Sequence, residues 1–448
     1  MGGAARGRRV IRTLGVWPRA ARAAYSLLLR IGLPLYLLRV LWRGRSEPLY
    51  ATAIGERIGR YRTAAKPGAL WIHAVSLGET RAAAPLIDAL RAVLPGCALL
   101  LTHGTATGRS AGQPLLRDGD AQAWLPFDTP GAVRRFFEHF APVAGVLMET
   151  EIWPNLLARA QARGVPMLLA NARLSERSRR RGQRVDLLLR PAFESLAAAF
   201  AQTEADAARL REAGAQTVSV EGNLKFDLAP DPRLLERGRR WKAAVASRGV
   251  VLAAVTREGE EATLLVAWHG VALPRPLLVI VPRHPQRFEA VAELIAGAGF
   301  ALSRRSAWRE APPEAAATAD VWLGDSMQEM PAWYALAEVA LLGGSFAPLG
   351  GQNLIEAAAC GCPVVMGPHT FNFKQAAELA LAAGAATRVA DMAGGVAAAL
   401  ALTGGAGGAL REEQSRHALA FAQRHRGAAA RMASRILATT SSTRGAAA

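Results

Sequence analysis

Short apolar runs alternate with longer amphipathic runs along most of this chain, and this rhythm limits the folds that the chain can adopt. Helical patterns such as 80–94 and 153–164 separate the apolar runs of the first half. Those runs lie at 70–75, 97–103, 121–126, 143–149, 166–171, 197–203 and 217–222. Strands that are apolar on both faces and alternate with helices form a parallel sheet covered on both sides. The sequence therefore predicts an α/β, Rossmann-like domain over residues 46–228.

The second half of the chain repeats this rhythm after an interruption. Residues 228–244 are charged and contain prolines, and we interpret them as a linker. Further apolar runs lie at 249–256, 277–282, 321–325, 339–344 and 363–367. They predict a second Rossmann-like domain over 229–438, and the small, polar residues 439–448 predict a disordered tail. Open α/β sheets bind ligands at the carboxyl ends of their strands, so we expect a ligand cleft between the two domains.

The charge and the composition of the chain restrict the kinds of partner that it can bind. The net charge of +18 indicates an anionic partner, such as nucleic acid, an acidic membrane or a phosphorylated substrate. The basic clusters lack interleaved aromatic residues, so we predict no nucleic-acid partner. One basic run is either a contact for anionic lipid or a solvated loop: Arg173, Arg177, Arg179, Arg180, Arg181 and Arg184. The three cysteines and eight histidines show no metal-ligand spacing, so we predict no metal and no cofactor.

The N-terminal residues 1–45 differ from the rest. A hydrophobic stretch at 24–42 is about as long as a membrane span, but it contains Arg30 and Arg39. Arginines also lie on both of its flanks, and no cleavage site for a signal peptide follows. We expect an uncleaved helix that lies in the surface of the membrane, with its arginines on anionic head groups. A single-pass anchor and an ordinary buried helix are the alternatives.

Carboxylates follow two of the predicted strands of the first domain. In HAVSLGE (73–79), Glu79 falls in the first turn of a helix, where the helix dipole alone favours a carboxylate. The alternative is a general base at the mouth of the cleft. Glu149 and Glu151 follow another strand, and alternation directs at most one of them into the cleft. Lys225 follows a third strand, where its ammonium group would meet developing negative charge.

The second domain carries residues suited to a nucleotide. Arg283, His284 and Arg287 follow a strand in a loop that prolines stiffen, which indicates either a cationic clamp or a solvated basic loop. The glycine-rich segment 343–351 leads into a helix that begins near Asn353. Backbone N–H groups at such a helix start hold phosphate, and Glu356 would accept from ribose hydroxyls. The segment has neither P-loop nor dinucleotide spacing, which favours a nucleotide sugar.

Together these motifs resemble the bacterial transferases of 3-deoxy-D-manno-octulosonic acid (Kdo), which act in the synthesis of lipopolysaccharide. The resemblance covers nearly the whole chain in order. It is carried by ERIGRY (56–61), HAVSLGET (73–80), METEIWPNL (148–156), NARLSERS (171–178), GNLKFD (222–227), VPRHPQRF (281–288), LGDSMQEM (323–330) and GGQNLIEAAACGCPVVMGPHTFNF (350–373). It implies a glycosyltransferase B fold and an inverting, metal-independent transfer of Kdo from CMP-Kdo to a lipid A precursor, lipid IVA, at the cytoplasmic face of the bacterial inner membrane.

The resemblance also implies roles for single residues. Glu79 would be the general base, and Glu149 and Lys225 would support the transition state. The residues that would hold CMP are Pro282, Arg283, Met327, Gln328, Glu329, Asn353, Leu354, Ile355 and Glu356. The chain departs from the family pattern at Val255, Arg257, Gln328, Gln352 and Leu354. The alternatives are another nucleotide-sugar enzyme of the same fold and a catalytically inactive, membrane-associated binding protein.

Overall fold

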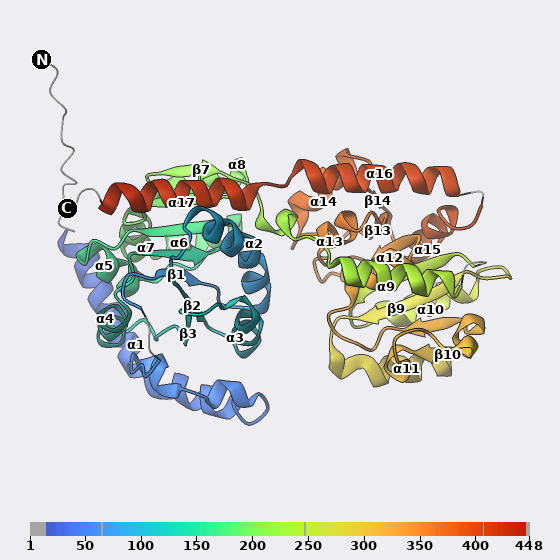
Figure 1. The fold of residues 1–448 in the computed structure, drawn as a ribbon, viewed down its shortest axis with the longest axis horizontal. Coiled ribbons are helices and arrows are strands. Elements are labelled where there is room, and N and C mark those ends of the chain that lie inside the picture. The colour runs from blue at the N-terminus through green and yellow to red at the C-terminus, as the bar shows by residue number, and fades with distance from the viewer. Residues whose placement is uncertain (1–14, 64–65, 246–247, 406, 445–448) are drawn as a thin grey trace, which may run out of the picture. The chain divides into compact units, whose positions relative to one another are not determined.

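The computed structural model describes residues 15–63, 66–245, 248–405 and 407–444, with side chains to residue 440. The chain folds into two compact units. Unit 1 comprises residues 1–227 and 427–448, and unit 2 comprises residues 228–426. Each unit is built on its own parallel sheet, as the alternating sequence pattern predicts (Figure 1).

Unit 1 contains a seven-stranded sheet in the order β3-β2-β1-β4-β5-β6-β7, and every neighbouring pair is parallel. The strands are β1 Leu70–His73, β2 Leu99–His103, β3 Ala121–Trp124, β4 Ala144–Met148, β5 Met167–Ala172, β6 Ala198–Ala201 and β7 Val218–Val220. The helices are α1 Val16–Arg43, α2 Leu77–Val93, α3 Ala106–Gly112, α4 Pro130–Phe140, α5 Pro154–Ala162, α6 Glu176–Gln183, α7 Asp186–Glu194, α8 Glu204–Glu212 and α17 Ala428–Arg444. All seven strands predicted for the first domain are present.

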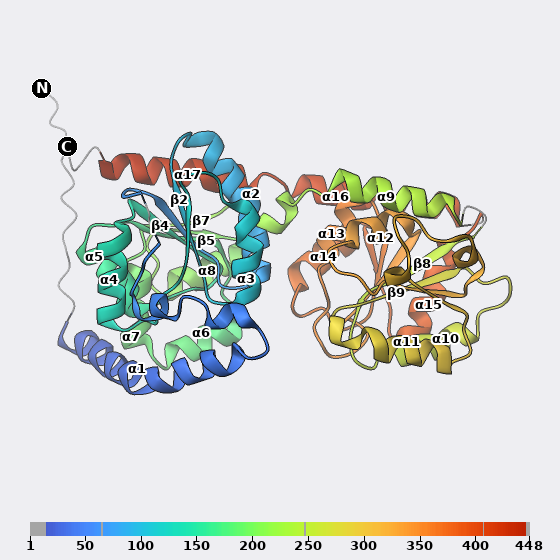
Figure 2. The same ribbon diagram turned by 60° about the horizontal axis from the view of Figure 1, so that its bottom comes forward.

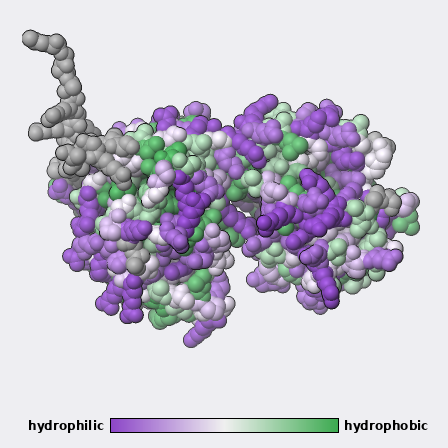
Figure 3. Space-filling model, in the orientation of Figure 1, coloured by the Kyte–Doolittle hydropathy of each residue, from purple (hydrophilic) through white to green (hydrophobic). Residues whose placement is uncertain are grey.

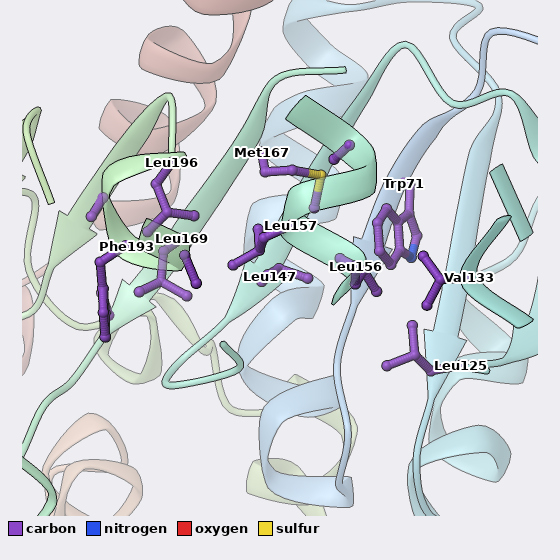
Figure 4. Close-up of a cluster of buried hydrophobic side chains, with 14 of the residues drawn as sticks. Trp71, Leu125, Val133, Leu147, Leu156, Leu157, Met167, Leu169, Phe193 and Leu196 are labelled. Atoms are coloured by element: carbon purple, nitrogen blue, oxygen red, sulfur yellow. The ribbon is translucent and has the colours of Figure 1, made fainter. Parts of the chain in front are cut away.

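Successive residues of these strands enter different cores because side chains alternate across a sheet. On β1, Trp71 packs with α4, α5, α7 and α8 on one face. Leu70 and Ile72 pack with α2 and α17 on the other. Figure 4 shows the first core, where Leu147, Leu156 and Leu157 lie between Trp71 and Phe193. The carboxyl ends of the strands are thereby held at one edge, where the loops that carry the candidate residues begin.

The N-terminal helix α1 lies along unit 1 (Figure 2). The Tyr25 hydroxyl donates to Asp128 Oδ2 at 3.0 Å, and Ser26 Oγ donates to Asn155 Oδ1 at 3.1 Å. Near the other end of the helix, Tyr36 stacks on Phe127 with ring centroids 4.5 Å apart, and Val40 is buried. The helix is therefore attached to unit 1 near both of its ends.

The C-terminal helix α17 belongs to unit 1, which corrects the predicted boundary and the predicted tail. Residues 427–438 pack on unit 1, and residues 439–444 continue α17 where we expected disorder. Residues 445–448 lie outside the described part of the chain. The reason is apolar burial: α17 contributes buried side chains to the core over α2, namely Ala428, Ala429, Met432, Ala433 and Ile436. The local sequence of α17 gave no sign of this, since the packing depends on a helix far away in the sequence.

Unit 2 contains a second seven-stranded sheet, in the order β10-β11-β9-β8-β12-β13-β14, again parallel throughout. Its strands are β8 Val250–Thr256, β9 Leu277–Pro282, β10 Leu302–Arg304, β11 Val321–Leu323, β12 Val339–Leu342, β13 Val364–Met366 and β14 Ala386–Arg388. Its helices are α9 Pro232–Ala243, α10 Glu260–His269, α11 Phe288–Gly297, α12 Met330–Leu336, α13 Leu354–Ala359, α14 Lys374–Ala382, α15 Met392–Ala401 and α16 Gly408–Arg424.

The stretch that we interpreted as a linker, 228–244, is mostly helix α9. The side chain of Asp231 caps the helix, Pro232 occupies its first turn, and Trp241 is buried. Gly238 allows close packing on α12, because a Cβ atom there would lie 2.1 Å from the carbonyl oxygen of Ala332. The charged residues of this stretch hid an amphipathic helix, and its prolines mark a helix start.

Candidate active site

Glu79 lies where the sequence analysis placed it, just beyond the carboxyl end of β1. Ser76 caps α2, and its hydroxyl donates to Glu79 Oε1 at 3.0 Å. The backbone N–H of Val75 donates to Glu79 Oε2 at 2.7 Å. These bonds hold the carboxylate at the start of α2, where the helix dipole, the structural alternative for this residue, also favours it. Burial, opposed by the Val75 hydrogen bond and reinforced by the charges of Glu149 and Glu151, raises the pKa of Glu79 to about 7. A carboxylate with that pKa is suited to general base catalysis near neutral pH.

Glu149 and Lys225 are brought together from two loops at the same edge of the unit 1 sheet. Lys225 Nζ lies 4.0 Å from Glu149 Oε1, and both side chains are partly exposed. Lys225 comes from the short 3-10 segment Leu224–Asp227, which follows β7. Glu149 directly follows β4 and adopts a left-handed backbone conformation, with φ of 57°. The structure therefore joins two of the three predicted catalytic side chains as an ion pair.

Glu151 contacts a tryptophan and a buried histidine. Trp153 Nε1 donates to Glu151 Oε2 at 2.8 Å, and His73 Nε2 lies 3.9 Å from the same oxygen. Burial raises the pKa of Glu151 and lowers the pKa of His73 to about 3, so the histidine is neutral. The expectation that at most one of Glu149 and Glu151 is directed into the cleft stays a prediction.

A polar network that sequence reasoning missed holds the Lys225 loop. The carbonyl side chain of Asn171, which is fully buried, accepts from the backbone N–H of Leu224 at 3.1 Å. Gln202 Nε2 donates to the backbone carbonyl of Asn171 at 2.9 Å, and Gln202 Oε1 accepts from Asn223 at 3.1 Å. Asparagine at the start of NARLSERS and of NLKFD is the only sequence signal for this network.

In unit 2, the glycine-rich segment after β12 is organised around a buried carboxylate that the sequence analysis did not identify. Glu260, 2% exposed, accepts from the backbone N–H groups of Gly344 at 2.7 Å, Phe346 at 3.1 Å and Ala347 at 3.3 Å. Those N–H groups are therefore engaged by the protein itself. Gly343 is required by packing, since a Cβ atom there would lie 2.2 Å from the carbonyl oxygen of Val255.

Two of the three residues predicted to form a cationic clamp after β9 do not fit that role. Arg287 forms two hydrogen bonds to the buried carboxylate of Glu261, at 2.6 and 3.0 Å. Burial and neighbouring arginines lower the pKa of His284, so it carries no charge near neutral pH. Arg283 follows the buried Pro282, and its backbone N–H donates to Thr256 at 3.0 Å. Arg283 is the member of the three that stays a candidate for binding a phosphate.

The segment 327–329 follows β11 and contains two exposed side chains and one that forms salt bridges. Met327 and Gln328 are exposed, and Gln328 adopts a left-handed conformation with φ of 67°. Glu329 is held by Arg237 at 2.6 Å and Arg305 at 2.9 Å, and these arginines help to keep its pKa below the usual range. The carboxylate of Glu329 is thus paired with two arginines. Within this segment, the groups that could contact a ligand are the side chains of Met327 and Gln328 and the backbone.

The segment 353–356 forms the start of α13, as the sequence predicts. Asn353 caps the helix by accepting from the backbone N–H of Ile355 at 3.2 Å. Leu354 and Ile355 are each 1% exposed, so their side chains belong to the core. Glu356 is partly exposed in the first turn. Of these four predicted nucleotide contacts, Asn353 and Glu356 are the ones whose side chains reach the surface.

Backbone strain gathers at the carboxyl ends of the strands in both units. Glu149, Asn171 and Val255 have positive φ values and lie at or just after the ends of β4, β5 and β8, and Gln328, also with a positive φ, lies in the loop between β11 and α12. Such conformations cost about 1–3 kcal/mol each and cluster at functional sites. Among the residues described, no group of three or more His, Cys, Asp or Glu side chains is placed to hold a metal ion. Metal independence stays a prediction.

Comparison with known proteins gives the same family for most of the chain. The profile of the family described as 3-Deoxy-D-manno-octulosonic-acid transferase (kdotransferase) matches residues 52–228. The 3-deoxy-D-manno-octulosonic acid transferase of Bordetella pertussis is 48% identical over 425 residues, which cover 92% of this chain and 97% of that protein. The enzyme of the same name from Haemophilus influenzae is 34% identical, covering 79% and 84%.

The fold has relatives of known structure. The crystal structure of Anabaena HepE in complex with UDP-glucose superimposes with a TM-score of 0.55 at 14% identity, covering 83% of this chain and 99% of that one. At this identity the likeness concerns the fold alone. Two parallel sheets with helices on both faces agree with the predicted glycosyltransferase B fold.

Proposed function

Because this chain belongs to the family of Kdo transferases, we propose that it transfers Kdo from CMP-Kdo to a hydroxyl of lipid IVA, with inversion at the anomeric carbon. Membership rests on 48% identity over 92% of the chain. It makes the protein a glycosyltransferase that transfers Kdo, and it confirms the resemblance found in the sequence. The donor nucleotide, the acceptor and the stereochemical course are our proposal.

The observation that carries the mechanism is Glu79, a half-buried carboxylate whose pKa is raised to about 7 by burial. In the proposed step the acceptor oxygen attacks the anomeric carbon of Kdo while the bond from that carbon to the CMP phosphate breaks. The acceptor proton passes to Glu79, which must therefore be ionised at the start. Both Glu79 oxygens accept one hydrogen bond, which leaves a lone pair for the acceptor hydroxyl.

Positive charge is needed where CMP departs, because the phosphate gains negative charge as the bond breaks. We assign Arg283 to this role, and we assign Lys225, oriented by Glu149 at 4.0 Å, to charge that develops in the transition state. CMP is a good leaving group, so the reaction needs no metal ion. We assign the binding of CMP to unit 2, through Pro282, Arg283, Met327, Gln328, Glu329, Asn353, Leu354, Ile355 and Glu356, with Glu329, Leu354 and Ile355 contributing backbone groups.

We place the reaction at the cytoplasmic face of the bacterial inner membrane, with α1 lying in the membrane surface. Among the described residues, α1 is the helix long and apolar enough to cross a membrane. Its contacts with Asp128, Asn155 and Phe127 would break if it spanned the bilayer. Large apolar side chains cover its outward side, including Leu28 at 69% and Leu35 at 71% exposed. A helix with one attached and one apolar exposed side is suited to lie in the interface.

Mass spectrometry of the product tests the proposal. Purified protein, tetraacylated lipid A precursor and CMP-Kdo generated in situ should yield an acceptor heavier by whole Kdo units. The number of units counts the transfers. A folded protein that adds no mass to this acceptor, or that adds a different sugar, would contradict the proposal and favour another nucleotide-sugar enzyme.

The Glu79→Gln variant is the reference for a folded protein that binds CMP but does not transfer Kdo. It keeps a side chain of the same size that still accepts from Val75, and it removes the base. We expect transfer to fall by about 10²–10⁴-fold while CMP binding is unchanged, since that is the usual contribution of a general base. Retention of most of the wild-type turnover would mean that the base is another residue.

A further inference from the structure

Unit 1 contains a cavity that the proposed chemistry does not use. Its volume is about 360 Å³, in the range of pockets that bind small ligands. It lies among the loops after β4 and β5 and the helices α6 and α7. Its apolar walls are Ile152, Leu174, Val185, Leu189, Phe193 and Ala213.

Two of the arginines that line this cavity, Arg179 and Arg190, are paired with carboxylates of the protein. Arg179 pairs with Glu176 at 2.7 Å and with Glu212 at 3.1 Å. Arg190 pairs with Asp186 at 2.7 Å. A polar ligand inside would compete with these pairs and face apolar walls, so the interior favours a hydrocarbon group.

A basic hollow adjoins the cavity on α6. It is lined by Glu176, Arg177, Arg180, Arg181 and Arg184, and Arg181 lines the cavity as well. Arg180 pairs with Glu176 at 2.8 Å. Within the described part of the chain, Arg177, Arg181 and Arg184 have no acidic side chain within 4.0 Å. An apolar cavity next to uncompensated positive charge matches a molecule that carries both a hydrocarbon chain and an anionic head group.

The position of the cavity relates it to the candidate active site and to the membrane helix. Thr150 and Ile152 line it, and they alternate with Glu149 and Glu151, two carboxylates whose charges act on Glu79. On its other side, α7 packs against α1 (Figure 2). A lipid that leaves the membrane beside α1 would thus meet the cavity close to the carboxylate loop.

We propose that this cavity binds one acyl chain of the acceptor glycolipid, and that Arg177, Arg181 and Arg184 bind a phosphate of the same molecule. The inference rests on the proposed function, since it takes the acceptor to be an acylated, phosphorylated sugar. It predicts that the protein recognises the acceptor by its acyl chain and its phosphate, which lie away from the hydroxyl that receives the sugar.

Filling the cavity tests this inference in the full-length protein. Gly182 lines the cavity on α6, and a Cβ atom there would lie 3.5 Å from Leu189 Cδ1, an ordinary contact. Gly182→Phe should raise the KM for the tetraacylated acceptor about tenfold, equivalent to about 1.4 kcal/mol. The KM for a deacylated acceptor and the KM for CMP-Kdo should stay unchanged. Leu187→Phe is the matched control, because Leu187 lies on α7 and is 58% exposed.

The charged part of the site is tested separately. Arg181→Gln should raise the KM for the phosphorylated acceptor and leave the KM for its dephosphorylated form unchanged. Arg134→Gln, on α4 of the same unit and 60% exposed, should affect neither acceptor. An equal effect of Arg181→Gln on both forms would overturn the assignment of the phosphate.

Several outcomes would overturn the acyl-chain site. They are a Gly182→Phe variant whose KM for the acylated acceptor stays within about twofold of wild type, and a KM that rises equally for both acceptors. If wild type transfers no Kdo at all, the proposed function fails first. Direct binding of the acylated acceptor then decides: binding that Gly182→Phe weakens supports the site, and unchanged binding overturns it.

Discussion

At the scale of single residues, Glu79 combines a structural and a proposed catalytic role. Its carboxylate accepts hydrogen bonds from the Val75 backbone N–H and the Ser76 hydroxyl at the start of α2, which fixes its position at the end of β1. A capping carboxylate normally has a low pKa because the helix dipole and N–H donors favour its charge. Here burial outweighs those effects and raises the pKa to about 7. The hydrogen bonds from Val75 and Ser76 therefore hold the proposed base in place, while burial raises its pKa.

This balance predicts the pH dependence of transfer. In the proposed mechanism only ionised Glu79 accepts the proton, so the rate should fall as the pH drops through about 7. The negative charge of Glu151 disfavours ionisation of Glu79, and Glu151→Gln removes it. The acidic limb of the pH–rate profile should move to lower pH in that variant. Glu138→Gln, on the exposed face of α4, is the control and should leave the limb in place.

Either of two results would contradict this prediction. An acidic limb that Glu151→Gln leaves unmoved would mean that another group titrates. A limb that moves to higher pH would mean that Glu151 supports ionisation of Glu79 through a contact that outweighs its charge.

The sequence placed the candidate residues better than it predicted their partners. Glu79, Glu149 and Lys225 lie at strand ends because those ends can be recognised from apolar runs. Arg287 was expected to be free for a ligand, but it pairs with Glu261 on another helix. Glu329 likewise pairs with Arg237 and Arg305. Such pairs depend on tertiary contacts, which the local pattern does not contain.

At the scale of secondary structure elements, α1 has two distinct sides. One side carries Tyr25, Ser26, Tyr36 and Val40 against unit 1. The other carries large exposed side chains at helical spacing, namely Trp17, Leu27, Leu28, Ile31, Leu35, Leu38 and Trp42. A contiguous apolar face of this kind marks a membrane or protein contact. The arginines within the helix, Arg30 and Arg39, are exposed and so can meet lipid head groups.

Under the membrane location that we propose, replacing the exposed apolar side chains should detach the protein from membranes without unfolding it. We expect a variant with glutamine at Leu28, Ile31, Leu35 and Leu38 to lose binding to anionic vesicles in a flotation assay. Transfer to acceptor in detergent micelles should be retained, since these side chains do not pack on unit 1. Val266→Gln, 76% exposed on α10, is the control and should float like wild type. Full flotation of the quadruple variant would place the membrane contact elsewhere.

How well a helix or strand could be predicted from the sequence depends on how much of it is buried. Strands apolar on both faces, such as β1 and β9, were predicted within about two residues of their ends. The edge strands β10 and β14 were missed, because each has three residues and mixes polar with apolar side chains. Helix α9 was missed because most of its surface is charged, and its buried Trp241 is an isolated signal.

At the scale of the whole molecule, the chain leaves unit 1 after Asp227 and returns to it at Gly427. The carboxylate of Asp227 joins these two points, since it accepts from the backbone N–H groups of Gly427 at 2.5 Å and Ala429 at 2.6 Å. Arg435 of α17 pairs with the buried Glu221 at 3.3 Å. Unit 2 is thus inserted into unit 1, and unit 1 is complete only when α17 has been added.

This arrangement predicts that α17 stabilises one unit only. Ile436 is fully buried in the core over α2, so Ile436→Ala should lower the free energy of unfolding of unit 1 by about 2–5 kcal/mol. Calorimetry in the presence of CMP assigns the transitions, because a ligand raises the midpoint of the unit that binds it. Under our proposal that unit is unit 2, and Ile436→Ala should shift the other transition. Ala430→Ser, on the exposed side of α17, should shift neither transition.

The opposite result would contradict this prediction. If Ile436→Ala lowers the midpoint of the transition that CMP raises, then α17 stabilises the unit that binds the nucleotide. Either the assignment of CMP to unit 2 or the independence of the two units would then be wrong.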